Sequence, residues 1–107
     1  MKPLKWNHYL ACFFAGFWAL NVLPHLLHGI SGQAFPTPFA SPPFQGLSSP
    51  LVNTSWALFN IVLAYWLARV GRLSPERPLT MGLFLLGFAV LAWFMAYAAA
   101  LMPSLPK

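Results

Sequence analysis

The chain has 107 residues, of which 59% are hydrophobic and only 7% are charged. Soluble domains average about 25% charged residues, and a chain this short could not cover so much apolar surface in water. The composition therefore excludes an ordinary water-soluble domain and predicts one all-α integral membrane domain over residues 1–107. The net charge of +5 does not indicate a nucleic-acid partner, because the basic residues are few and scattered along the sequence.

Three apolar stretches, about residues 8–30, 50–68 and 79–102, are each long enough to cross a bilayer, which takes about 20 helical residues. A segment surrounded by lipid must satisfy its own backbone hydrogen bonds, so each stretch is expected to be a transmembrane helix. The pairs Ser49-Pro50 and Ser74-Pro75 both look like helix starts, since serine caps the first turn and proline suits the first helical position.

The basic residues predict the orientation of the three spans. Two lysines precede the first span, three arginines lie in the inner loop 69–78, and one lysine ends the chain. The outer loop 31–49 has no charged residue. By the positive-inside rule, we expect a multi-pass protein of the bacterial inner (cytoplasmic) membrane with its amino terminus inside and its carboxyl terminus outside.

The loop 31–49 reads SGQAFPTPFASPPFQGLSS and has four prolines and three phenylalanines. Uncharged loops of this length are uncommon unless they are functional or disordered, and its phenyl rings are costly to leave in water. One interpretation is a lid folded on its own helix ends, with rings in the lipid headgroups. The other is a docking surface for a larger partner, using Phe35, Phe39 and Phe44.

Polar residues inside the first two spans recur at helical spacing and predict a polar interhelical seam. They are Asn21, His25 and His28 on the first span and Asn53 and Asn60 on the second. The two helices are expected to be antiparallel, and Asn21 and Asn60 both lie near mid-span. His28 is seven residues from Asn21, and Asn53 is seven residues from Asn60. Because each gap rises about 10.5 Å, His28 is expected to lie opposite Asn53. His25 is expected to lie level with Trp56 of the second span.

Pro24 lies one residue before His25 within the first span. Its ring lacks an N–H and clashes with the carbonyl of residue 20, so it predicts a kink and a carbonyl without its usual donor. Asn60 is the expected donor to that carbonyl.

A cofactor-binding module is the alternative function, because a histidine inside a span is by default a functional candidate. His25 and His28 are three residues apart, and neutral imidazole binds haem iron, the magnesium of a chlorophyll-type pigment, or a metal ion. The sequence requires no cofactor, and no carboxylate lies nearby. A third possibility is an oligomeric transporter of a small solute along the seam.

Three segments, NVLPHLLHGISG, FPTPFASPP and GLSSPLVNTSWALFN, resemble a group of small bacterial polytopic membrane proteins. The group shares an Asn-x-x-Pro-His span, a Pro/Phe-rich loop and Ser-Ser-Pro-x-x-Asn, and the likeness covers roughly residues 16–60. It has no known activity, so the resemblance implies no catalytic or binding residue. It does imply that Asn21, Pro24, His25 and Asn53 belong to one pattern, together with Ser49 and Pro50.

Alanines recur every fourth residue on the first and third spans, at Ala11, Ala15 and Ala19 and at Ala92, Ala96 and Ala100. Such spacing allows close helix contact, within the chain or with other membrane subunits or copies of it. With one acid in the chain, acid–base chemistry would rest on histidine alone. We therefore expect a structural or accessory subunit of a larger membrane complex, without catalysis of its own.

Overall fold

The computed structural model describes residues 3–101 and contains three helices: α1 (Trp6–Ile30), α2 (Pro50–Val70) and α3 (Pro78–Leu101). Their ends lie within two residues of the predicted spans wherever the structure describes them; the predicted last residue, Met102, lies outside the described range. All three helices are long and apolar enough to cross a membrane. The chain is all-helical, and its helices suggest a multi-pass membrane protein.

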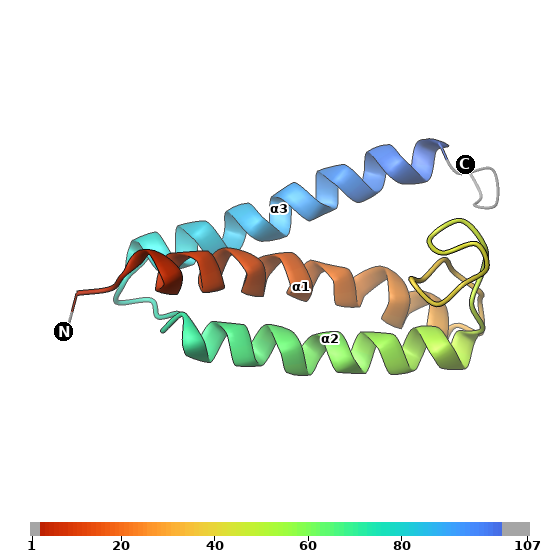
Figure 1. Ribbon diagram of the computed structural model, residues 1–107, viewed down its shortest axis with the longest axis horizontal. Coiled ribbons are helices and arrows are strands. Elements are labelled where there is room, and N and C mark those ends of the chain that lie inside the picture. The colour runs from red at the N-terminus through yellow and green to blue at the C-terminus, as the bar shows by residue number, and fades with distance from the viewer. Residues whose placement is uncertain (1–2, 102–107) are drawn as a thin grey trace.

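The helix α1 lies between the other two helices (Figure 1). Neighbouring α2 runs antiparallel to it and α3 runs parallel to it, and in the described residues α2 and α3 do not contact each other. In its most apolar window α1 is 44% buried, against 17% in α2 and in α3. The middle helix therefore provides most of the core, and each outer helix is held by one interface.

The two predicted helix starts have different outcomes. The hydroxyl of Ser49 accepts a hydrogen bond from the Val52 N–H at 3.1 Å, with Pro50 in the first helical position, which confirms the first. The second is wrong, because α3 begins at Pro78. Residues 74–77 form a turn instead, since the Arg77 N–H donates to the Ser74 carbonyl oxygen at 3.0 Å and the Ser74 N–H donates to the Thr80 hydroxyl.

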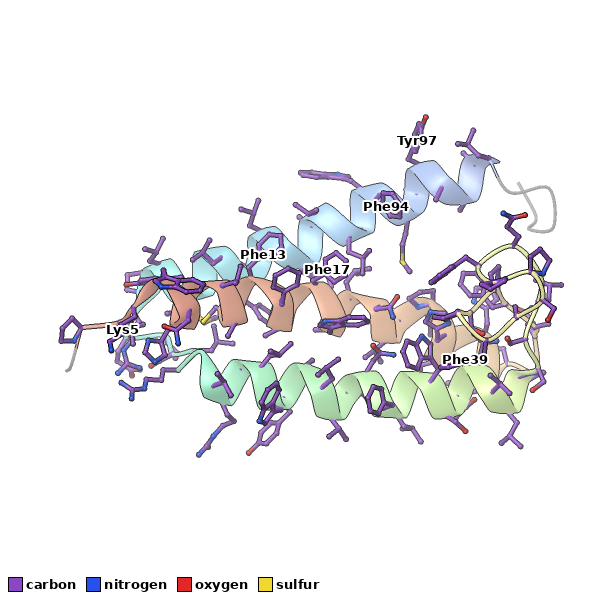
Figure 2. The ribbon with its side chains drawn as sticks, in the orientation of Figure 1. Lys5, Phe13, Phe17, Phe39, Phe94 and Tyr97 are labelled. Carbon is purple, nitrogen blue, oxygen red and sulfur yellow. The ribbon has the colours of Figure 1, made fainter. Side chains whose placement is uncertain are left out.

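Two glycines bring α1 and α3 into backbone contact. A Cβ at Gly16 would lie 1.9 Å from the Phe84 carbonyl oxygen, and one at Gly87 would lie 1.9 Å from that of Phe13. Figure 2 shows Phe13 and Phe17 where the two helices meet. Leu91 is the last buried residue in the described part of α3, and beyond it α3 diverges from α1 (Figure 1).

Residues 31–49, called the lid from here on, fold over the ends of α1 and α2 (Figure 1). The N–H and carbonyl groups of Phe35 pair with those of Ser48 at 3.2 and 3.0 Å. Thr37 is fully buried; its hydroxyl bonds to that of Ser48, and its carbonyl accepts the Phe44 N–H at 2.9 Å. These bonds give a loop of irregular backbone a defined structure. The opposite end of the bundle, with Lys5 and the α2–α3 turn, is called the basic end.

Candidate functional site

Asn53 connects α1, α2 and the lid. It is fully buried one turn into α2, and its Oδ1 lies 2.7 Å from Nδ1 of His25. Its amide nitrogen lies 3.0–3.2 Å from three backbone carbonyls, those of Phe35, Ser48 and Ser49. Every polar atom of this side chain therefore holds another segment in place, as a buried amide requires.

These contacts determine the tautomer of His25. Because the Asn53 amide nitrogen donates to carbonyls, the oxygen must face the imidazole, so Nδ1 of His25 is the donor. His28 is in the same state, since its Nδ1 lies 2.7 Å from the Pro24 carbonyl oxygen, which can only accept. When such a ring is neutral, its lone pair lies on Nε2, which in both histidines has no hydrogen-bond partner among residues 3–101.

The structure corrects the predicted pairing of the seam. His25, and not His28, meets Asn53, while His28 binds back to its own helix and lies under the Phe35 ring at 4.1 Å. The lid causes the difference, because the Phe35 ring covers His28 and the Phe35 carbonyl oxygen accepts a hydrogen bond from the Asn53 amide. The argument from helical rise considered only the two helices and left this third segment out.

The second polar contact lies near mid-span. Nδ2 of Asn21 donates to Oδ1 of Asn60 at 3.4 Å, and both side chains are buried. The Asn60 amide donates to the Trp56 carbonyl oxygen of its own helix at 2.6 Å, so the expected bond from Asn60 to the carbonyl of residue 20 is wrong. An asparagine within a helix has its own i−4 carbonyl within reach, and here that carbonyl is the acceptor.

The three phenylalanines of the lid have different surroundings. Phe35 lies against both histidine rings, with its centroid 5.4 Å from that of His25. Phe39 packs edge-on against Trp56 at 5.0 Å (Figure 2), yet 64% of its surface is exposed, and Phe44 is 59% exposed. Phe35 thus belongs to the interior, and the other two rings form the free surface of the lid.

A shallow apolar groove of about 380 Å³ lies on α2 beside the lid. Trp56 and Phe59 stack at 5.6 Å along it. Phe39 of the lid forms one edge, and the remaining lining residues are Leu51, Val52 and Ser55. The groove is open to the surroundings of the bundle and separate from the two histidines.

The histidine pair offers two imidazole nitrogens for a bound group. Among residues 3–101, no cluster of three or more histidine, cysteine or acidic side chains could hold a metal ion. Cys12 lies toward the basic end, where its thiol donates to the Gly71 carbonyl oxygen at 3.2 Å. A group held here would therefore have imidazole ligands from this chain only, with other ligands from outside it.

Sequence reasoning missed several residues that position this site. The hydroxyl groups of Thr37 and Ser48 bond to each other and stabilise the fold of the lid. Gly29 allows the end of α1 to approach α2, since a Cβ there would lie 2.2 Å from the Thr54 hydroxyl. The available signal was an isolated small residue within an apolar helix, which often marks close backbone approach.

Comparisons of the chain with protein-family models, curated proteins and solved structures gave no match.

Proposed function

We propose that this chain is a structural or accessory subunit of a larger membrane complex, without catalysis of its own. It lies in the bacterial inner membrane with its amino terminus inside, its carboxyl terminus outside and the lid on the outer face. The use of the buried polar side chains supports this proposal. Asn21 donates to Asn60 between α1 and α2, and Asn53 joins His25 of α1 to the lid. These side chains hold segments of the chain together and are not free to act on a substrate.

The observation on which the proposal mainly rests is the divergence of α3 from α1. Beyond Leu91, the described part of α3 has no buried residue and presents large exposed aromatic side chains, among them Phe94 and Tyr97 (Figure 2). The second half of α3 is therefore free to contact another helix. A transmembrane helix of another subunit would pack there and contact Ala98, which lies on the same face of α3 as Gly87 and Leu91, where a small side chain allows close approach.

Photo-crosslinking in the native membrane tests the proposal. A photoreactive phenylalanine analogue at position 94 is expected to form one discrete adduct with another membrane protein. The matched control is the same analogue at Tyr65, which is equally exposed on α2 but near the basic end. Native mass measurement after gentle extraction should show the same partner. Adducts with lipid only at both positions, together with a lone monomer, would refute the proposal.

The tautomers of the histidines favour one second candidate, a module that binds haem, a chlorophyll-type pigment or a metal ion. Ligand histidines commonly donate Nδ1–H to an oxygen and bind through the other nitrogen, and His25 and His28 both have that arrangement. The protein purified from its native source should then absorb visible light or contain metal. Its signal should fall in the His28→Gln variant, and a colourless, metal-free preparation would exclude this candidate.

A further inference from the structure

Four basic residues that are scattered in the sequence come together at one end of the fold. Lys5 precedes the first residue of α1, and Arg69, Arg72 and Arg77 lie at or after the end of α2. The turn after α2 packs on the start of α1, since a Cβ at Gly71 would lie 2.8 Å from the His8 carbonyl oxygen. Figure 1 shows that the start of α1 and the α2–α3 turn share one end of the bundle, where Figure 2 labels Lys5.

Hydrogen bonds within the turn hold these arginines on a defined backbone. The hydroxyl of the fully buried Thr80 accepts the Ser74 N–H at 3.2 Å and donates to the Arg77 carbonyl oxygen at 2.6 Å. The guanidinium of Arg77 donates to the Arg72 carbonyl oxygen at 3.1 Å, which closes the turn. The backbone that carries Arg72 and Arg77 is therefore defined by the fold and is not a free loop.

The charge of this end is not balanced within the chain. Lys5, Arg69 and Arg72 are exposed. The one acidic residue of the protein is Glu76, and its carboxylate accepts a hydrogen bond from the Ser74 hydroxyl. The lid at the other end contains no charged residue. Among residues 3–101, all charged side chains thus lie at the basic end of the bundle.

Aromatic side chains mark the depth of this end in a bilayer. Trp6 in the first turn of α1 and Tyr65 and Trp66 in the last turns of α2 are all more than half exposed. Tryptophan and tyrosine favour the headgroup level of a membrane. The four basic groups lie at or beyond these rings, which is the level of the lipid phosphates.

We propose that the basic end is a binding surface for the headgroup of an anionic phospholipid. The guanidinium groups of Arg69 and Arg72 bind the phosphate, for which the planar fork of arginine is well suited. Lys5 adds positive charge from α1. A headgroup held there would connect the start of α1 to the end of α2, which adds a lipid contact to the basic end of their interface.

Native mass spectrometry of the purified protein with added lipid tests this proposal. Phosphatidylglycerol should remain bound when phosphatidylcholine with the same acyl chains dissociates. Arg69→Gln and Arg72→Gln should each weaken retention of phosphatidylglycerol about fivefold, as expected for one basic group near an anionic surface, and Arg69→Lys should weaken it less. Equal retention of the two lipids, or unchanged retention in the Arg69→Gln/Arg72→Gln variant, would overturn the proposal.

Three controls distinguish a site from a general effect of charge. Gln33→Glu makes the same change in net charge on an exposed position of the lid and should leave lipid retention unchanged. Glu76→Gln removes the single acid and should maintain or strengthen it. Inorganic phosphate at millimolar concentration should not displace the lipid, and displacement would overturn the assignment to a membrane lipid. Circular dichroism should show that each variant retains its helices.

Discussion

The two interfaces of α1 differ in how they hold a helix. Toward α2, the contact is polar: the His25–Asn53 bond at 2.7 Å and the Asn21–Asn60 bond at 3.4 Å link the helices. Toward α3, no side-chain hydrogen bond between the two helices occurs in the described residues, and Gly16 and Gly87 place backbone against backbone. Directional bonds determine the register of a pair, while glycine contacts determine how closely the helices approach.

The difference also explains why the two outer helices leave α1 in different ways. The polar contacts toward α2 lie at mid-span and at the lid end, so α2 follows α1 over most of its length. The glycine contact lies in the half nearer the basic end, and no side chain between residues 92 and 101 forms a hydrogen bond with α1. The interface that lacks directional bonds is the one that opens.

The largest effect is expected from breaking the glycine contact. Gly16→Leu should lower the free energy of unfolding in mixed micelles by about 3 kcal/mol, because overpacking forces the backbones apart where a Cβ has only 1.9 Å of space. The matched control is Gly82→Ala on α3, where a Cβ meets nothing within 4 Å. It should stabilise the helix by about 0.5–1 kcal/mol. Equal effects of the two substitutions would contradict the role of the glycine contact.

Removing the central amide of the polar interface should have the next largest effect. Asn53→Ala is expected to cost about 2–3 kcal/mol, because it leaves the buried Nδ1–H of His25 without an acceptor. The lid should loosen as well, seen as faster hydrogen exchange of the Phe35 and Ser48 amides. Ser55→Ala on the exposed face of the same helix should change stability by less than about 0.5 kcal/mol. Unchanged exchange in the lid would argue against Asn53 as its anchor.

Double-mutant cycles should rank the two polar contacts of α1 and α2. The coupling between His25 and Asn53 is expected near the upper value for membrane hydrogen bonds, about 1.7 kcal/mol, and that between Asn21 and Asn60 near the average of about 0.6 kcal/mol. The shorter distance of the first pair is the reason. A larger coupling energy for Asn21 and Asn60 would reverse this ranking, and that pair would then be the main determinant of the register of α1 and α2.

The smallest effect concerns the turn that leads into α3. The Ser74 hydroxyl, the Glu76 N–H and the neighbouring Arg77 lower the pKa of the Glu76 carboxyl. The folded state therefore gains stability above the ordinary pKa of glutamate, about 4.3, and loses it as the pH falls through the lowered value. In Ser74→Ala, an NMR titration should show the Glu76 pKa shifted upward and a smaller loss of stability in acid. An unchanged pKa would contradict the assigned cause.

Some of the fold was predictable because it depends on local properties. The length of each apolar stretch gave helices whose observed ends lie within two residues of the predicted ones, and the Ser49 cap depends only on its own turn. The turn before α3 was not predictable in the same way. Ser74-Pro75 has the local pattern of a helix start, but the Ser74 N–H donates to the hydroxyl of Thr80, six residues later, and its carbonyl accepts the Arg77 N–H.

The candidate site was predictable in its members and not in its connections. Helical periodicity placed Asn21, His25, Asn53 and Asn60 on facing sides, and the structure brings these four together. His28 has the same periodicity, but it binds the Pro24 carbonyl and the Phe35 ring instead. The position of the lid decides this, and irregular backbone rich in proline has no period from which its path could be derived.

By itself, the amino-acid sequence determined that this chain forms long apolar helices, roughly how far each one extends, and which polar side chains share a face. These follow from composition and from the 3.6-residue turn, which each segment obeys without its neighbours. Only the tertiary structure decided that His25 meets Asn53, that α3 diverges past Leu91, and that scattered arginines gather beside Lys5. These contacts join residues far apart in the chain, and their geometry depends on how all the segments pack at once.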